Sequence, residues 1–281
     1  MKKILVTGAT GQLGSELKVL SFSYSQYEWI FADRTKVTLD DLELLQSQLG
    51  TIKPDIIFNC GAYTAVDKAE SEKELAFKIN HLAVELIAKH AIEKNVKLIH
   101  VSTDYVFDGT SSIALDENAE TKPINVYGES KLAGEKACAK ENPESIIIRT
   151  SWVYSKFGNN FVKTMQRLMQ EREEINVVND QIGSPTYAAD LAQAMIDILE
   201  SQKWISGIYN YSNEGEISWY EFALSIKEFG NYNCKVGGIP SSSYPTPAKR
   251  PNFSLLNKTK IKASYNLDIP NYKESLKKIF V

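Results

Sequence analysis

Near its N-terminus the chain reads Ile4-Leu5-Val6-Thr7-Gly8-Ala9-Thr10-Gly11-Gln12-Leu13-Gly14. A short apolar run typical of a buried strand leads into glycines at a G-x-x-G-x-x-G spacing, and a helix is expected to begin near Gln12. Because glycine has no Cβ, the backbone can turn tightly and approach a pyrophosphate, whose charge meets N–H groups at the helix N-terminus. The stretch predicts a nucleotide-binding turn formed by Gly8, Gly11, Gln12, Leu13 and Gly14. The alternative is a glycine turn that only packs helix against sheet.

Two charged residues after the next expected strand bear on the choice of cofactor. Asp33 follows Gly14 by 19 residues, where a carboxylate can accept hydrogen bonds from the hydroxyls of an adenosine ribose. Arg34 comes directly after it and can hold the 2′-phosphate of NADP, which Asp33 would repel. The sequence therefore predicts a nicotinamide dinucleotide and leaves NADH and NADPH as alternatives.

Short apolar runs alternate with amphipathic stretches along the first half of the chain. Such strands, buried on both faces and alternating with helices, predict an α/β fold with a Rossmann-type, doubly wound parallel sheet and a ligand beyond the carboxyl ends of its strands. An amphipathic helix is expected over Leu75–Lys94. The expected strands are Lys3–Val6, Trp29–Ala32, Asp55–Cys60, Lys97–Ser102 and Ser145–Arg149.

The alternation of expected strands and helices is less regular after about residue 150, where aromatic loops and a proline-rich segment follow. Residues 1–150 are therefore expected to form the dinucleotide-binding domain, and 151–281 a smaller substrate-binding region. The expected helix Ala188–Glu200 and strand Ile208–Tyr211 can rejoin the first sheet, so the two regions are expected to interleave.

Composition excludes several classes of function. The 281 residues carry 32 Lys and Arg against 35 Asp and Glu, a net charge of −3, which gives no general attraction to nucleic acid or an anionic membrane. The apolar run Ile4–Val6 is too short for a signal segment or a membrane span, so a cytoplasmic location is expected. The three cysteines and three histidines match neither a disulfide framework nor a metal-binding spacing, so no metal site is predicted from them.

A tyrosine and a lysine stand four residues apart in a stretch that reads as helical. Tyr127 and Lys131 would then share one face of the helix, where the ammonium is expected to lower the pKa of the phenol toward the working range. Thr103 follows a buried strand and can hydrogen-bond a reacting oxygen beside Tyr127. The alternative for Ser102 and Thr103 is a structural role in turning the chain.

The segments Thr7–Gly14, Ser102–Gly109 and Tyr127–Lys131 together resemble the extended short-chain dehydrogenase/reductase family. The resemblance is closest to the members that reduce dTDP-linked 4-keto-6-deoxyhexoses. It implies hydride transfer from NADPH or NADH to C4 of dTDP-4-dehydro-L-rhamnose, giving dTDP-L-rhamnose. The segments that carry this closer likeness are Asn59–Glu70, Arg149–Tyr154, Asp180–Thr186 and Arg250–Ser254.

The resemblance also implies roles for single residues. Tyr127 would protonate the alkoxide, and Lys131 would tune that phenol and hydrogen-bond the nicotinamide ribose. Two further groups of residues complete the expected site. Cofactor-lining residues would be Ala62, Tyr63 and Thr64, and substrate-binding residues would be Thr103, Asp104, Tyr127, Trp152 and Arg250, the last holding the diphosphate.

Some related reductases carry a magnesium ion between subunits, and Glu16 matches one of its ligands. The other ligands have no placed counterpart, so Mg²⁺ and a homodimer are left open. Other activities remain as alternatives: another sugar-nucleotide epimerase or reductase of the family, or a cofactor-binding regulatory subunit without catalysis. Tyr105 stands where related dehydratases have Glu, and the presence of Thr103, Tyr127 and Lys131 together favours an enzyme.

Overall fold

A six-stranded parallel sheet forms the centre of the protein, whose computed structural model describes residues 1–281. The strands lie in the order β10-β5-β4-β3-β1-β2, so the Rossmann-type sheet predicted from the sequence is confirmed. The central strands are buried on both faces, as their continuous apolar runs require. The strands of this sheet are β1 (Lys2–Thr7), β2 (Tyr27–Ala32), β3 (Ile56–Asn59), β4 (Lys97–Thr103), β5 (Ile146–Thr150) and β10 (Gly207–Asn210).

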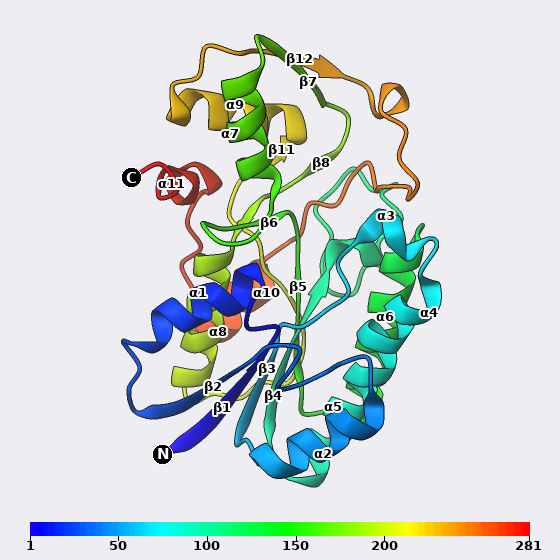
Figure 1. Ribbon diagram of the computed structural model, residues 1–281, viewed down its shortest axis with the longest axis vertical. Coiled ribbons are helices and arrows are strands. Elements are labelled where there is room, and N and C mark those ends of the chain that lie inside the picture. Colours follow the sequence, from blue (N-terminus) through cyan, green and yellow to red (C-terminus); the bar gives the residue numbers. More distant parts are fainter.

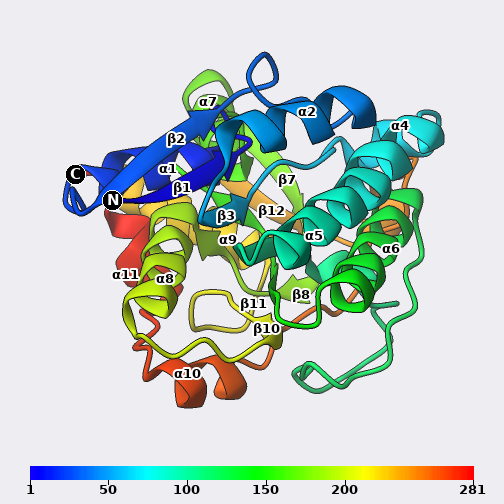
Figure 2. The same cartoon turned by 90° about the horizontal axis from the view of Figure 1, so that it is seen from below.

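Helices cover both faces of the sheet (Figures 1 and 2). One apolar core joins α1 (Gln12–Ser21) and α8 (Ala188–Glu200) to the sheet, and a second lies under α2 (Leu42–Ile52) and α5 (Ala83–Glu93) on the other face. The single helix expected over Leu75–Lys94 is in fact three consecutive elements: α4 (Lys73–Phe77), a π-helical turn (Lys78–Leu82) and α5. The remaining helices on this side are α3 (Val66–Ala69) and α6 (Val126–Glu141).

The later part of the chain sits over the carboxyl edge of the sheet (Figure 1). It pairs short strands into three small ribbons, β6 with β9, β7 with β12, and β8 with β11, around a third apolar core. The chain also returns to the large sheet through α8 and β10, as expected. The elements of this part are β6 (Val153–Tyr154), α7 (Phe161–Glu171), β7 (Glu174–Val178), β8 (Ile182–Gly183), β9 (Thr186–Tyr187), β11 (Ile217–Ser218), α9 (Trp219–Gly230), β12 (Lys235–Ile239), α10 (Thr259–Tyr265) and α11 (Tyr272–Lys277).

Helix α6 lies unusually close to the π-helical turn. A Cβ added at Gly134 would stand 2.0 Å from the carbonyl oxygen of Asn80, so only glycine permits this approach. The Asn80 side chain also donates to the carbonyl of Tyr63 and to Ser130 Oγ, both at 3.0 Å. The contact fixes α6, which carries two of the predicted catalytic residues, against the neighbouring helices. None of the helices is long and apolar enough to span a membrane.

Candidate active site

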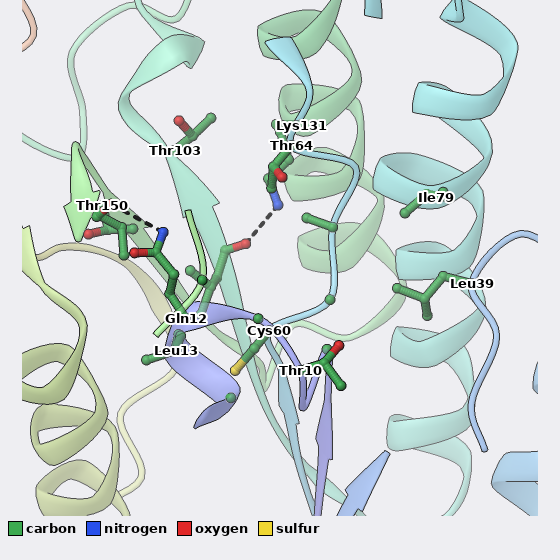
Figure 3. Close-up of a pocket in the computed structure, with 18 of the residues that line it drawn as sticks. Thr10, Gln12, Leu13, Leu39, Cys60, Thr64, Ile79, Thr103, Lys131 and Thr150 are labelled. Carbon is green, nitrogen blue, oxygen red and sulfur yellow. Dashed lines mark hydrogen bonds between the residues drawn. The ribbon is translucent and has the colours of Figure 1, made fainter. Parts of the chain in front are cut away.

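A cavity of about 540 Å³ opens at the carboxyl edge of the sheet, beside the ends of β1 and β3. From β1 the chain continues to β2 on one side, and from β3 it continues to β4 on the other. This is the reversal of strand order at which ligands bind in such sheets. Figure 3 shows Leu39 and Ile79 on one side of the cavity and Thr150 on the other, with Lys131 between them. The cavity brings together most of the predicted residues: Gly8, Gly11, Gln12, Leu13, Gly14, Asp33, Arg34, Ala62, Thr64, Thr103, Asp104, Tyr127, Lys131 and Trp152.

The glycine turn packs so closely that a side chain at Gly8 or Gly14 would clash with neighbouring backbone atoms. We call the concave backbone of this turn the glycine cradle. Gly8 has a φ of +65°, and a Cβ at Gly14 would stand 2.4 Å from the Gly8 carbonyl oxygen. Gly11 begins helix α1 without a side-chain cap, which leaves N–H groups of the first turn facing the cavity rim. These features fit the pyrophosphate of a dinucleotide, which needs close backbone approach and N–H donors.

Asp33 and Arg34 lie side by side on the cavity wall, at the end of β2. Asp33 Oδ1 accepts from the hydroxyl of Thr35 at 2.7 Å and from its backbone N–H at 2.9 Å. These hydrogen bonds lower the pKa of the carboxyl, so Asp33 stays ionised. A fixed anion and a free guanidinium are therefore both available to the adenosine ribose.

We expect these two side chains to act in opposite directions on cofactor choice. Asp33→Ala should weaken NADH binding more than NADPH binding, because the carboxylate accepts from the 2′-hydroxyl and repels a 2′-phosphate. Arg34→Ala should weaken NADPH binding more. Fluorescence titration of each variant with both cofactors measures the effect, and each variant is the control for the other. Equal losses for the two cofactors would contradict this prediction.

The three predicted catalytic side chains meet in the cavity. Thr103 ends β4, while Tyr127 and Lys131 lie one turn apart near the start of α6, which Asn125 caps through a 2.7 Å bond from Gly128 N. Thr103 is within hydrogen-bonding reach of Tyr127 and also donates to Asp104 Oδ1 at 3.1 Å. Lys131 Nζ donates to the Val101 carbonyl at 2.7 Å (Figure 3).

The expected effect of Lys131 on the tyrosine is wrong for this structure. Burial raises the pKa of Tyr127 to about 12, and the carboxylate of Asp104 adds to the rise, while the hydrogen bond with Thr103 opposes it. Lys131 Nζ is held by the Val101 carbonyl, and Lys131 is not among the groups that lower the pKa of Tyr127 here. Tyr127 is consequently a neutral phenol at physiological pH, the form that a proton donor requires.

Burial shifts two neighbouring groups as well. It lowers the pKa of Lys131 to about 8 and raises the pKa of Asp104 to about 6. Asp104 Oδ2 is buried without a hydrogen bond of ordinary geometry, and Ser254 lies beside the carboxyl. An unpaired buried carboxylate oxygen at a cavity wall favours a ligand that brings a hydroxyl donor.

Trp152 forms the far wall of the cavity in an uncommon backbone conformation. Its φ is +47°, a left-handed value that is costly for a bulky residue. The indole stacks on Trp219 with 3.7 Å between ring centroids and an angle of 14°. Gly183 makes room for it, since a Cβ there would stand 2.9 Å from Trp152 Cζ2. The ring is thus held as a flat apolar surface facing the site.

Two predicted site residues are not on the cavity wall. Tyr63 directs its hydroxyl to Glu72 Oε2 at 2.6 Å and packs among Ala69, Ala76 and Ile79 in a small apolar core, so its side chain is structural here. The cause is a contact with Asn80, 17 residues further along the chain, whose side chain binds both the N–H and the carbonyl of Tyr63.

Arg250 is the second residue outside the wall. Its Nη1 and Nη2 pair with the carboxylate of Asp67 at 3.1 and 2.9 Å, and Nη1 also donates to the Ala248 carbonyl. It lies near Tyr105, which does line the cavity. Arg250 therefore stands at the edge of the site with its charge already paired.

Glu16 does not fit a magnesium ligand in this chain. Its buried carboxyl accepts from Ser155 Oγ at 2.6 Å, and burial raises its pKa above the ordinary value. No group of three or more His, Cys, Asp or Glu side chains is arranged to hold a metal ion.

The sequence interpretation missed several wall residues. Leu39 follows Asp33 closely, and Ile79 lies in the π-helical turn, so both come from segments with no motif of their own. Gly158 and Asn159 reach the cavity from the loop after β6, and Gln12 is bound to that loop through Asn160 at 2.9 Å. The run Gly158-Asn159-Asn160, whose last residue caps α7, is the one signal in the sequence for a turn at this place.

The sheet, the glycine turn and the Tyr127–Lys131 pair together define a Rossmann-type protein of the short-chain dehydrogenase/reductase class. Within that class, the chain belongs to the RmlD substrate binding domain family, whose family model matches residues 1–281.

Similar proteins of known name agree with this family assignment. A dTDP-4-dehydrorhamnose reductase from Aggregatibacter actinomycetemcomitans is 40% identical over 290 residues, covering 99% of this chain and 98% of that protein. The crystal structure of a dTDP-4-dehydrorhamnose reductase from Bacillus anthracis, in complex with NADP, is 40% identical with a TM-score of 0.94, covering 100% and 99% of the two chains. A UDP-glucose 4-epimerase from Thermotoga maritima has a TM-score of 0.82 at 20% identity, covering 98% and 96%, and shares the fold alone.

Proposed function

We propose that this protein is an oxidoreductase that uses NADPH to reduce the C4 keto group of dTDP-4-dehydro-L-rhamnose, giving dTDP-L-rhamnose. The observation that carries the proposal is the meeting of Thr103, Tyr127 and Lys131 beside a glycine cradle. The relatives at 40% identity bear the name of this reductase, and one of them was solved with NADP. NADH is the alternative cofactor, because Asp33 remains beside Arg34.

The residues divide the work of binding the dinucleotide. The turn from Gly8 to Gly14 and the start of α1 would hold its pyrophosphate, and Asp33 or Arg34 its adenosine ribose. Leu39 and Ile79 offer an apolar surface next to that ribose. Lys131 would hydrogen-bond the second ribose, from the centre of the cavity. When bound, the cofactor supplies the hydride for C4.

The protein's own part in the reaction is to place the keto sugar and move one proton. Tyr127 donates its phenolic proton to the oxygen at C4 as negative charge develops there, and Thr103 hydrogen-bonds the same oxygen. Lys131 keeps a positive charge near the phenolate that results. Asp104, with its unpaired oxygen, accepts from a sugar hydroxyl, and the indole of Trp152 covers the apolar side of the ring.

The direct test mixes purified protein with NADPH or NADH and a panel of dTDP-4-keto sugars. Loss of absorbance of the reduced cofactor reports turnover, and the stereochemistry at C4 of the product identifies the reaction. An epimerase would interconvert sugars without net cofactor consumption, and a regulatory subunit would bind cofactor without turnover. Either result would contradict the proposal. A homodimer and a cytoplasmic location stay predictions from the sequence.

Arg250 is expected to bind the diphosphate of the substrate by exchanging its partner Asp67 for phosphate oxygens. Arg250→Ala should raise KM for the nucleotide sugar by roughly 10–100-fold, because a charge-assisted hydrogen bond contributes about 1.5–3 kcal/mol. Higher salt should weaken substrate binding less in this variant than in the wild type. The matched control is Arg167→Ala, which removes an exposed arginine paired with Glu171 on α7 and should leave KM unchanged. An unchanged KM in Arg250→Ala would exclude Arg250 from substrate binding.

A further inference from the structure

A buried ion pair lies directly behind the proposed catalytic residues. Glu135 is on α6, one helical turn beyond Lys131 and two beyond Tyr127. Its carboxylate receives Arg149 Nε at 3.0 Å and Nη2 at 2.8 Å, and the two side chains are only 2% and 3% exposed. Ser102 Oγ donates to the same carboxylate at 2.5 Å. Helix α6 and strands β4 and β5 therefore meet at the buried carboxylate of Glu135.

The partners of Glu135 stand next to residues of the site. Ser102 precedes Thr103 at the end of β4, and Arg149 precedes Thr150, a cavity-wall residue at the end of β5. Glu135 thus joins the helix that carries Tyr127 and Lys131 to both strands that end beside it. A buried pair of this kind is weak evidence for stability, because desolvation of the charges offsets their attraction. A buried ion pair at this place therefore needs a reason other than stability.

The charges around Lys131 supply that reason. Burial raises the pKa of the Cys60 thiol to about 12 and of the Cys138 thiol to about 11, so both are neutral. Burial also holds the pKa of His100 well below its usual value, so the imidazole carries no charge. Tyr127 is a neutral phenol. Among the groups that face Lys131, Glu135 is the one that bears a negative charge, and it favours the ammonium form.

We propose that Glu135 is a positioning residue for the proposed reduction: through Ser102 and Arg149 it sets α6 against β4 and β5, and it places a carboxylate one helical turn from Lys131. It touches neither substrate nor cofactor. The inference rests on the proposed function for its catalytic consequence, but its effect on Lys131 is a property of the free protein.

The test uses two variants and a control. Glu135→Gln removes the charge and keeps the shape of the side chain. The double variant Glu135→Met, Arg149→Met replaces the pair by apolar side chains, a change that is often neutral for stability. Glu129→Gln makes the first substitution on the exposed side of the same helix, where Glu129 pairs with Lys73 at 3.5 Å. Melting temperature, kcat and NADPH affinity are measured for each, from about pH 6 to about pH 10.

The sign of the pH effect follows from Lys131. Its lowered pKa of about 8 means that the ammonium is lost as the pH rises through that value, so NADPH affinity and kcat/KM should fall on the alkaline side. Removing the neighbouring anion lowers the pKa further. In Glu135→Gln, the alkaline fall should therefore move to lower pH by about one unit, whereas the double variant removes one charge of each sign and should move it less. We expect kcat to drop about 10–100-fold as the helix loses its register, while Glu129→Gln behaves like the wild type.

The outcomes separate this inference from the proposed function. A lower melting temperature with unchanged kcat and an unshifted alkaline fall would make Glu135 purely structural and overturn the inference. If the double variant does not fold, the pH dependence of Glu135→Gln decides alone. If the wild type binds NADPH but reduces no keto sugar, the proposed function fails, and the pH dependence of NADPH binding still tests the influence of Glu135 on Lys131.

Discussion

Replacing Tyr127 by phenylalanine is expected to lower kcat by about 10²–10⁴-fold, the usual contribution of a positioned acid or base. The phenol is neutral at physiological pH, and burial, which raises its pKa to about 12, reinforces that form. Phenylalanine keeps the ring, which lies edge to face against Tyr105 with 5.5 Å between centroids. NADPH affinity should therefore stay close to that of the wild type.

Stopped-flow or steady-state loss of NADPH absorbance measures the effect, and titration without substrate checks cofactor binding. The matched control is Tyr220→Phe, which removes a hydroxyl in α9, away from the cavity wall. Wild-type turnover in a folded Tyr127→Phe protein would exclude this residue as the proton donor. A similar loss in Tyr220→Phe would show that the assay responds to general damage.

The second large effect is expected from Gly14→Ala. The new methyl group would stand 2.4 Å from the Gly8 carbonyl oxygen and 2.7 Å from Ala9 Cα, both backbone atoms that cannot turn aside. The glycine turn must then move away from α1, and the N–H groups lose their aim at the pyrophosphate. Since a displacement of about 1 Å can cost 10²-fold, we expect NADPH affinity to fall at least about 100-fold.

Gly50→Ala is the control for this substitution. Gly50 lies in α2, and a Cβ there meets nothing within 4 Å. Alanine should stabilise that helix by about 1 kcal/mol, because glycine is the poorer helix former, and NADPH affinity should not change. The two variants are compared by fluorescence titration and thermal melting. A Gly14→Ala protein that binds NADPH as the wild type does would mean that the turn does not hold the pyrophosphate.

The central sheet could be predicted from the sequence because its strands are short, mainly apolar runs, and helices follow β1, β2, β3 and β4 along the chain. The first helix begins at Gln12 and α8 spans Ala188–Glu200, as the sequence predicts. The return of the chain through β10 was also visible, since Ile208–Tyr211 has the same apolar character as the earlier strands. Local pattern alone specifies these elements.

The rest depends on contacts between distant segments. The ion pair between Arg250 and Asp67 joins residues 183 positions apart in the sequence, and the local sequence around each residue does not predict it. The direction of Tyr63 is decided by Asn80, and the pKa of Tyr127 by the burial that the assembled site imposes. The Tyr127–Lys131 spacing predicted which residues meet, but the order of their proton affinities needed the tertiary structure.

The late return of the chain to its first sheet has a consequence for synthesis. Strand β5, whose five residues are all buried, has β10 as its outer neighbour, and the face built by β1 and β3 is covered partly by α8. A nascent chain that has emerged only to residue 150 therefore exposes an unpaired apolar strand edge and an uncovered face, both prone to aggregation. We expect this unpaired edge and uncovered face to persist until α8 and β10, residues 188–210, have left the ribosome.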